Sequence, residues 1–237
     1  MLRTRTEHLA IREAALTASR VRWVLLAGIY AIFLSWYGGS GDPISPEEIK
    51  EYAAIVDARN PGGSSPEGDD SEVSADLRRF IETDDGQEFV MVNLNVYRDE
   101  PHYTDGRKGA GSAEEVEQQY TSKIAPRLFA RACHPLLMVE PAVHIGGIGD
   151  FERQDWSRVT LVRYRSRRDF VEFVLEQDYA QDIDHKWAAL SRSHAMAATP
   201  RISFATVRLV PLLILVVIGL LLDRIGASSA SKWSNPT

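Results

Sequence analysis

An α+β domain held between two membrane-spanning helices is the fold class that this sequence of 237 residues predicts. Two apolar segments lie near the ends of the chain, at residues 23–41 and 202–222. Between them, the apolar residues first recur with helical spacing and then, from Glu88 onward, alternate as they do in strands. The segments from Glu88 onward follow the order strand, helix, strand, strand, helix, strand, which is the split βαβ or ferredoxin-like arrangement.

The first apolar segment, residues 23–41, contains no charged side chain. At about 1.5 Å per residue, a helix of this length nearly covers the ~30 Å hydrocarbon core of a bilayer. A cleaved signal peptide is the alternative, because it also has a basic start followed by an apolar run. The length of the run, the 22 residues before it and the lack of a clear small-x-small cleavage site favour a membrane-spanning helix.

The second apolar segment is long enough to span only if it extends from residue 222 back to residue 202, which includes Arg208. The long stem of that arginine can carry its charge to the headgroups. The N-terminal segment, residues 1–22, contains five arginines and two glutamates, and short basic flanks stay in the cytoplasm. The tail, residues 223–237, is basic as well. We therefore expect a two-pass protein of the plasma (inner) membrane with both termini in the cytoplasm and an extracytoplasmic central domain.

The central region is strongly acidic. Residues 41–205 contain 30 acidic and 19 basic side chains, a formal charge of −11. Such a surface repels nucleic acid and argues against a role in binding it. Cys133 is the only cysteine, so no intrachain disulfide forms, and its apolar helical surroundings favour a buried small hydrophobe over a reactive thiol.

Residues 42–76 are predicted to form a helix and a flexible acidic linker ahead of the main domain, residues 77–201. Ser45 and Pro46 open a helix with acidic residues in its first turn, and residues 60–70 are rich in Gly, Pro, Ser and acid. A second helix, residues 71–83, ends at an Asp-Asp-Gly turn. In the main domain, Ser112 and Glu115 form a capping box that starts a helix, and Pro126 is expected to kink it. The predicted strands are residues 88–98, 136–149, 157–165 and 194–200.

In the ferredoxin-like arrangement, helices cover one face of an antiparallel sheet and something else buries the other face. The wholly apolar side of the second strand is predicted to meet the helices: Leu137, Val139, Val143 and Ile145. The open face is then predicted to collect Asn93, Asn95, Glu140, His144, His194 and Met196. A second subunit is the expected cover of this open face.

The motifs MVNLNVYR at residues 91–98, DWSRVTLVRYRSRRDF at 155–170 and DYAQDIDHKWAAL at 178–190 resemble the domain of unknown function 1330 family. The resemblance runs from about Leu77 to Pro200. It implies membership of the dimeric α/β-barrel superfamily, in which the open sheet face of one protomer closes against that of its partner. The family has no established reaction. Both membrane helices and the insertion near residues 60–70 are additions to its pattern.

A pocket between the helices and the sheet, or inside the dimer barrel, is the predicted site. Its catalytic candidates are His144, His185 and Tyr164, and its ligand-binding candidates are Asn93, Asn95, Glu140 and Arg163. Glu140 and His144 lie four residues apart on one extended strand, about 13 Å, which is too far for a direct acid–base pair. The alternative interpretation is that these residues are satisfied polar groups at a subunit interface.

Arg163 belongs to a run of four arginines with Arg165, Arg167 and Arg168. Such a run either receives an anionic ligand by forked hydrogen bonds or pairs with local acids, of which Asp169 and Glu172 are near in sequence. The chain has no HExxH or CxxC spacing, so no metal site is predicted, and no cofactor is expected.

The sequence thus favours a membrane-anchored extracytoplasmic domain, expected to be a homodimer, that binds a small molecule or a partner protein. The alternative is a small-substrate enzyme of the α/β-barrel monooxygenase or isomerase type, in which a histidine transfers a proton. The sequence does not decide whether the protein is an enzyme. A cavity lined by apolar groups and a few converging polar ones favours the enzyme, whereas partner side chains filling that space favour the binding role.

Overall fold

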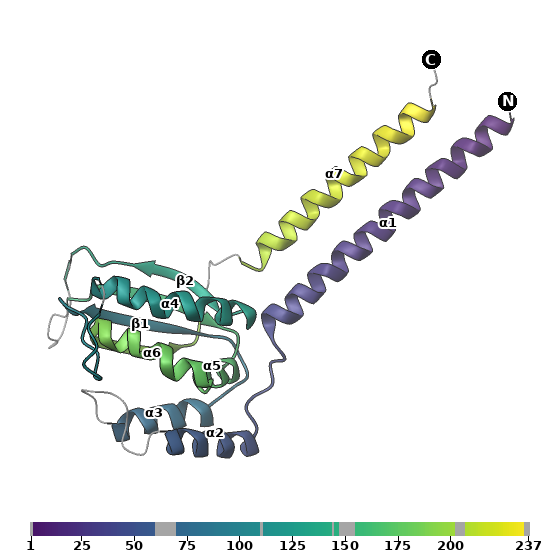
Figure 1. Cartoon of the computed structure of the whole chain (residues 1–237). Coiled ribbons are helices and arrows are strands. Elements are labelled where there is room, and N and C mark those ends of the chain that lie inside the picture. Colours follow the sequence, from purple (N-terminus) through teal and green to yellow (C-terminus); the bar gives the residue numbers. More distant parts are fainter. Residues whose placement is uncertain are drawn as a thin grey trace. The chain divides into compact units, whose positions relative to one another are not determined.

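The computed structural model describes residues 2–59, 70–109, 111–143, 145–146, 155–201 and 207–234. The chain divides into two compact units, Met1–Trp36 with Ser203–Thr237, and Tyr37–Ile202. The first unit contains helices from both ends of the sequence, and the second contains a sheet with its helices (Figure 1). The two apolar segments thus belong to one unit and the predicted α+β domain to the other.

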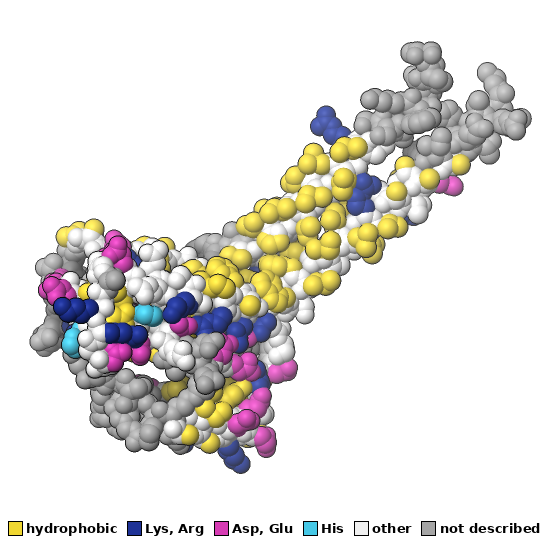
Figure 2. All heavy atoms as spheres, viewed as in Figure 1, with side chains coloured by type: hydrophobic (Ala, Val, Ile, Leu, Met, Phe, Trp, Pro, Cys, Tyr) yellow, Lys and Arg dark blue, Asp and Glu magenta, His cyan; other side chains and the backbone are white. Residues whose placement is uncertain are grey.

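The first unit is a pair of helices, α1 (Leu2–Gly38) and α7 (Leu209–Ser234). Both are long and apolar enough to cross a membrane, over Glu13–Gly38 and Leu209–Gly226. Large apolar side chains project outward along them, among them Val24 and Ile32, and Figure 2 shows hydrophobic side chains over much of their described surface. These two spans near the ends of the chain fit a two-pass membrane protein.

The two helices of this unit contact each other through polar groups at two levels. Trp23 Nε1 donates a hydrogen bond to Asp223 Oδ2 over 2.9 Å, and Arg22 forms an ion pair with the same carboxylate at 3.0 Å. At the other level, the Tyr30 hydroxyl donates to the carbonyl of Arg208 over 3.0 Å. These contacts fix the register of α1 against α7.

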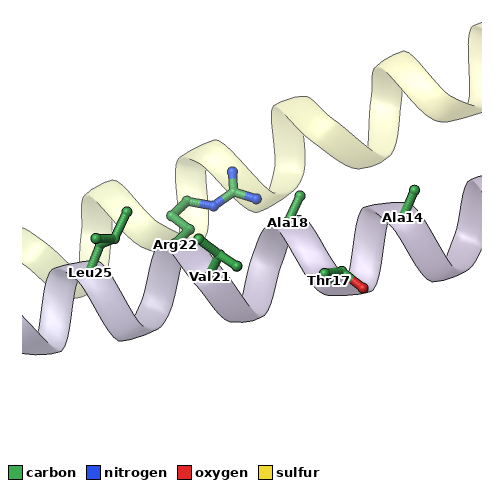
Figure 3. Close-up of a pocket in the computed structure, with 6 residues that line it drawn as sticks. All are labelled: Ala14, Thr17, Ala18, Val21, Arg22 and Leu25. Atoms are coloured by element: carbon green, nitrogen blue, oxygen red, sulfur yellow. The ribbon is translucent and has the colours of Figure 1, made fainter.

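Small residues shape both helix surfaces. A Cβ atom added at Gly219 would lie 2.6 Å from the Trp23 ring, so only glycine lets this indole pack against α7. Farther toward the N-terminus, one face of α1 lines an open groove of about 730 Å³ beside α7 (Figure 3). The groove is mostly apolar; its residues are Ala14, Thr17, Ala18, Val21, Arg22 and Leu25.

The second unit contains a four-stranded antiparallel sheet with the order β2-β3-β1-β4. Its elements follow the predicted strand and helix order, with the second helical region broken into α5 and α6. They are β1 (Phe89–Tyr97), α4 (Ala113–Ala130), β2 (His134–Val139), β3 (Arg158–Tyr164), α5 (Arg167–Val174), α6 (Gln177–Ala189) and β4 (Leu190–Ala198). The predicted ferredoxin-like fold is therefore confirmed.

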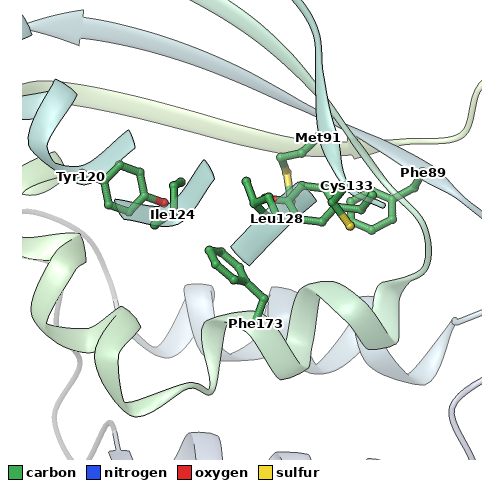
Figure 4. Packing of buried hydrophobic residues seen from close by; sticks show 8 residues of the cluster. Phe89, Met91, Tyr120, Ile124, Leu128, Cys133 and Phe173 are labelled. Atoms are coloured by element: carbon green, nitrogen blue, oxygen red, sulfur yellow. The ribbon is translucent and has the colours of Figure 1, made fainter. Parts of the chain in front are cut away.

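The main core lies between the sheet and the helices α4, α5 and α6 (Figure 4). Phe89 and Tyr164 stack with their ring centres 5.1 Å apart, and Phe89 and Met91 pack with the buried face of α4. That face repeats at helical spacing through Tyr120, Ile124 and Leu128. The predicted capping box of Ser112 and Glu115 is present, and α4 continues past Pro126. Cys133 is fully buried in this core, as its surroundings predicted.

Two further helices precede the sheet, α2 (Pro46–Arg59) and α3 (Asp70–Glu82). They pack on the outer side of α5, where Ile44, Ile81 and Val171 form a small buried cluster. The described parts of residues 42–76, which were predicted as a helix and a linker ahead of the domain, therefore pack as part of the second unit. Residues 60–69, the centre of the predicted linker, lie outside the described residues.

The prediction of which sheet face meets the helices was wrong. Phe89, Met91 and Asn95 of β1 are buried on the helix side, so Asn93 and Asn95 do not belong to the open face. Leu137 and Val139 of β2 are 48% and 40% exposed rather than packed on helices. Val143 and Ile145 lie beyond the end of β2 and are exposed as well. The strand predicted over residues 136–149 is observed as His134–Val139, so it ends before Pro141.

The open face of the sheet is instead strongly apolar. Antiparallel register places Val92 opposite Leu161 and Met196, and Leu94 opposite Val159 and His194. His194 and Met196 therefore lie on the open face, as predicted. Within this chain, no described element buries Leu137, Val139 or Met196, which are all exposed.

Candidate functional site

A buried carboxylate lies at the interface of α4 with the sheet. Glu117 occupies the inward face of α4, three residues before Tyr120, and is only 6% exposed. Its carboxylate accepts hydrogen bonds from the Tyr97 hydroxyl, from Arg158 Nη1 over 3.2 Å and from Asn95 Nδ2 over 3.4 Å. Buried carboxylates are rare unless they are paired in this way. We call these four residues, together with Lys186, the Glu117 cluster.

Asn95 connects the cluster to the edge strand β4. Its amide is buried, and its Oδ1 accepts a hydrogen bond from the Ser193 hydroxyl over 2.8 Å. Because its Nδ2 donates to Glu117, both ends of the side chain are engaged. A polar residue therefore takes a core position of β1 at little cost, since its hydrogen bonds are made inside the protein.

Arg158 reaches from the surface into the cluster. Its Nη2 pairs with Glu140 Oε1 at 2.9 Å, and the Glu140 side chain is 66% exposed. Its guanidinium lies 5.0 Å from the centre of the Tyr97 ring. The remaining nitrogen, Nε, is buried and has no hydrogen-bond partner among the described residues. Arg158 thus has one unused donor.

Lys186 lies on α6. Its Nζ lies 6.0 Å from the centre of the Tyr120 ring and 5.2 Å from that of the Trp187 ring. Burial lowers the pKa of Lys186, and the charge of Glu117 acts in the opposite direction. Burial, followed by the hydrogen bond to Glu117, raises the pKa of Tyr97, so this phenol remains a donor at neutral pH. The described contacts of the Lys186 ammonium are thus with these two aromatic rings.

His185, one residue earlier on α6, lies in a separate network. Its Nδ1 is 2.7 Å from the Tyr103 hydroxyl, and its Nε2 is 3.5 Å from Lys123 Nζ. Lys123 in turn pairs with Asp182 at 2.9 Å. Burial and the charge of Lys123 lower the pKa of His185. Both ring nitrogens therefore face protein groups, within a set of ion pairs that joins α4 to α6.

Arg163 lies at the other end of β3 from Arg158. Its Nε and Nη2 both donate to Glu88, at 2.9 and 2.6 Å. Its Nη1 donates to the Ala132 carbonyl over 2.7 Å, and Nη2 also donates to the Tyr37 carbonyl over 2.9 Å. The guanidinium lies 3.8 Å from the centre of the Tyr37 ring, whose hydroxyl is 2.7 Å from His134 Nε2. We call this set the Arg163 anchor, because every guanidinium nitrogen is used.

The other three arginines of the run also have partners within the second unit. Arg165 pairs with Asp169, the local acid that the sequence suggested. Arg167 donates to the Phe80 carbonyl over 2.6 Å, and Arg168 pairs with Glu48 of α2. The pKa of Glu48 is lowered to about 2, chiefly by the hydrogen bond from Arg168. Arg167 and Arg168 therefore attach α5 to α3 and α2.

The structure brings together only some of the predicted site residues. Asn95 belongs to the Glu117 cluster, because its amide donates to Glu117. Glu140 contacts the cluster from outside, because its carboxylate accepts a hydrogen bond from Arg158. Tyr164 lies in the hydrophobic core, and Asn93 lies on the helix side of β1 between Met91 and Asn95. His185 and Arg163 lie in the separate networks described above. His144 lies outside the described residues.

Sequence reasoning missed Tyr97, Glu117, Arg158 and Lys186. Two of these had a signal in the sequence. Glu117 continues the inward spacing of Tyr120, Ile124 and Leu128, and Lys186 continues that of Tyr179 and Ile183 on α6. A charged residue at a position reserved for apolar side chains is the pattern that identifies both. Among the described residues, no group of three His, Cys, Asp or Glu side chains is placed to hold a metal ion.

Comparison with known proteins identifies similar structures only. No family model matches the chain, and no curated protein does. One similar structure is the crystal structure of RPA0582, a protein of unknown function from Rhodopseudomonas palustris. Its sequence is 21% identical to this chain and the TM-score is 0.48. The match covers 59% of this chain and 100% of the RPA0582 chain. Methylated RPA0582 is 22% identical with a TM-score of 0.49, covering 59% and 98%.

Proposed function

We propose that this chain is a membrane-anchored homodimeric domain that faces away from the cytoplasm and binds a small molecule at the Glu117 cluster. The observation that carries the proposal is the mismatch of donors and acceptors there. Glu117 accepts hydrogen bonds from three donors, whereas the buried Arg158 Nε has no hydrogen-bond partner among the described residues. Buried donors without acceptors cost free energy, about 1–3 kcal/mol each, which a bound ligand offsets.

The dimer is proposed from the open face of the sheet. Antiparallel sheets commonly bury one face and expose a polar one to water. Here the uncovered face consists of Val92, Leu94, Leu161 and Met196 with the exposed Leu137. A second copy offers an identical apolar face, and two-fold pairing of such faces is the commonest form of homo-oligomer. The resemblance to the domain of unknown function 1330 family favours the same pairing, because it implies a dimeric α/β barrel.

The membrane topology is proposed from the charge of the flanks. Five arginines precede the apolar run of residues 23–41, and Arg224 and Lys232 follow that of residues 202–222. Both ends then lie in the cytoplasm. A reporter that fluoresces only in the cytoplasm, fused after Thr237, is expected to be bright, and a phosphatase that is active only after export is expected to be silent at the same position. The reverse pattern would overturn the topology while leaving the binding site untouched.

The binding function is tested on the full chain, purified in detergent. Small molecules of four classes, namely acids, amides, alcohols and amines, are screened for a rise in the unfolding temperature. At least one class is expected to stabilise the natural protein and not the Tyr97→Phe variant, which keeps the ring but removes the hydroxyl that contacts Glu117. A screen in which no class distinguishes the two proteins would overturn the proposed function.

A further inference from the structure

We propose that the end of the second unit that carries Phe129 rests in the headgroup layer of the membrane, with the Phe129 ring inserted between the lipids. The partner of this surface is a lipid bilayer, and the contact is separate from the Glu117 cluster. It rests on one part of the proposed function, the placement of α1 in a membrane. It follows from the position of Tyr37 on the chain, the aromatic contacts that connect Tyr37 to Phe129, and the exposure of the Phe129 ring.

Tyr37 belongs both to a membrane span and to the second unit. The span of α1 covers Glu13–Gly38, and the second unit begins at Tyr37. Tyrosine and tryptophan rings are enriched at the headgroup level where spans end, and Trp36 directly precedes Tyr37. Tyr37 therefore marks the level of the membrane surface. Side chains of the second unit that lie near Tyr37 lie near that surface, whichever way the unit is turned.

His134 connects Tyr37 to Phe129. The Tyr37 hydroxyl is 2.7 Å from His134 Nε2, and the two ring centres are 5.7 Å apart. The His134 ring also stacks on the Phe129 ring, with 6.5 Å between the centres and 7° between the planes. The centre of the Phe129 ring is therefore at most about 12 Å from that of the Tyr37 ring. A headgroup layer is roughly 5–8 Å thick, and interfacial helices insert their apolar side chains about 5–10 Å, so Phe129 is within reach of the lipids.

The Phe129 ring points away from the core of the second unit. It is 54% exposed at the end of α4, whereas Leu128 beside it is 6% exposed. Single exposed apolar side chains are common on soluble proteins, so exposure alone would mean little. The place of this ring decides, because an apolar ring close to the end of a span gains free energy by leaving water for the headgroup boundary.

The charged groups next to these rings are paired. Arg131, the C-cap residue of α4, forms an ion pair with Glu176. Arg163, whose guanidinium lies over the ring of Tyr37, forms one with Glu88. These two acids therefore do not repel anionic headgroups as unpaired acids would.

The test measures contact with lipid at single labelled positions of the full chain in phosphatidylcholine nanodiscs. A fluorescent label is attached to an introduced cysteine in a Cys133→Ala background, so that the native thiol does not react. Ala130→Cys reports on the Phe129 end and keeps the ring, and Gln118→Cys, an exposed position about 18 Å earlier on α4, is the control. Headgroup nitroxides are expected to quench the label at residue 130 at least about 2-fold more than at residue 118, because only the former lies within insertion depth.

Matched variants assign the contact to the ring. With the label at residue 130, Phe129→Asp is expected to reduce the quenching at least about 2-fold, whereas Phe129→Trp keeps an interfacial ring and is expected to retain it. Circular dichroism confirms that each variant is folded. In a parallel sample, Ile32→Cys carries the label at a position of the span that is 72% exposed, and nitroxides in the acyl chains are expected to quench it.

The possible failures can be distinguished. Equal quenching at residues 118 and 130, quenching that persists in Phe129→Asp, or its loss in Phe129→Trp would overturn the inference while leaving the proposed function in place. A label at residue 130 that is shielded from water but not quenched by lipid would also overturn it, because a second copy of the chain would then cover the ring. Absence of quenching at residue 32 would overturn the membrane placement of α1, and this contact with it.

Discussion

Two arginines at opposite ends of β3 show how the same side chain takes two different roles. Arg163 lies on the open face of the sheet, and each of its guanidinium nitrogens has an acceptor in Glu88 or in a backbone carbonyl. Arg158 lies on the helix side, where one nitrogen has none among the described residues. The Arg163 anchor is closed, and it serves the structure. The Glu117 cluster is open, and the unused Arg158 Nε is what makes it a candidate binding site.

The two sites differ in the stability that is lost when the cation is removed, because this loss depends on how many buried groups then lack a partner. Removing one partner of a buried ion pair costs about 3–5 kcal/mol, because the other charge stays buried and unpaired. Removing a cation that has no full set of partners costs far less, since little is left unsatisfied. The stability of variants at the two sites therefore separates a structural cation from a binding one.

The largest expected effect is at the anchor. Arg163→Met removes the partner of Glu88 and of two carbonyls, and is expected to lower the free energy of unfolding by about 3–5 kcal/mol. The measurement is chemical denaturation of the full chain in detergent. The control is Arg79→Met on α3, an exposed arginine, for which a change within about 0.5 kcal/mol is expected. Equal stability of Arg163→Met and the natural protein would show that the anchor is not needed.

The second effect concerns the face that Arg163 shares with the apolar side chains of the sheet. Leu161→Asp places a charge in the middle of the proposed dimer interface and is expected to weaken association by about 2–5 kcal/mol. Light scattering corrected for detergent is expected to show a monomer for this variant. Leu161→Met conserves the apolar volume and is expected to remain a dimer. A monomeric natural protein at the same concentration would contradict the proposed pairing.

The third prediction is a pH dependence at the anchor end of β3. Burial raises the pKa of the Cys133 thiol to about 11 from its ordinary value of 9.0. The folded state thus favours the neutral thiol more than the unfolded state does. The stabilising contribution of the neutral thiol to the free energy of unfolding is fully present below pH 9. It is lost as the pH rises from about 9 to about 11. The loss amounts to about 1 kcal/mol at pH 10 by this linkage.

Cys133→Ala removes the titrating thiol and serves as the reference for this measurement. The difference in unfolding free energy between the two proteins is expected to decrease between pH 8 and pH 10. A difference that stays constant over this range would mean that the thiol is accessible to water in the folded state, in conflict with its complete burial.

The smallest effect is expected in the open cluster. Lys186→Met leaves Glu117 with Tyr97, Arg158 and Asn95, and exchanges a lysine of lowered pKa for an apolar side chain. The free energy of unfolding without ligand is expected to change by less than about 1 kcal/mol. A loss as large as that of Arg163→Met would show that Lys186 is part of the structure, and the contrast between the two ends of β3 would disappear.

The order of elements was accessible from the sequence because local patterns specify it. Ser112 and Glu115 mark the start of α4, and alternation marks β1. The faces of the sheet were not accessible by the same reasoning. Assigning the more apolar face to the core assumes that a chain buries its own apolar surface, and here the side with Leu137 and Leu161 is left uncovered by the described chain.

The candidate site was accessible only in part, for a related reason. Asn95 and Glu140 were selected because they are polar residues in a predicted strand, and both meet Arg158 or Glu117. Their central partner, Glu117, lies on a helix 22 residues away in sequence from Asn95. Its role depends on tertiary packing, which turns an acid on an apolar helix stripe into the acceptor for three strand residues. His185 was selected for its chemistry alone, and its ring nitrogens are occupied by Tyr103 and Lys123.

If α1 and α7 cross a membrane, as proposed, the contact between Trp23 and Gly219 has a consequence for how the two helices respond to different bilayers. The indole rests against a glycine and donates to Asp223 one turn farther along α7, so neither helix slides past the other without losing both contacts. A bilayer that is too thin for its hydrophobic spans is usually accommodated by tilting or sliding of individual helices. Here the two spans are expected to tilt together as one rigid hairpin, and membrane thickness would then set a single angle for both.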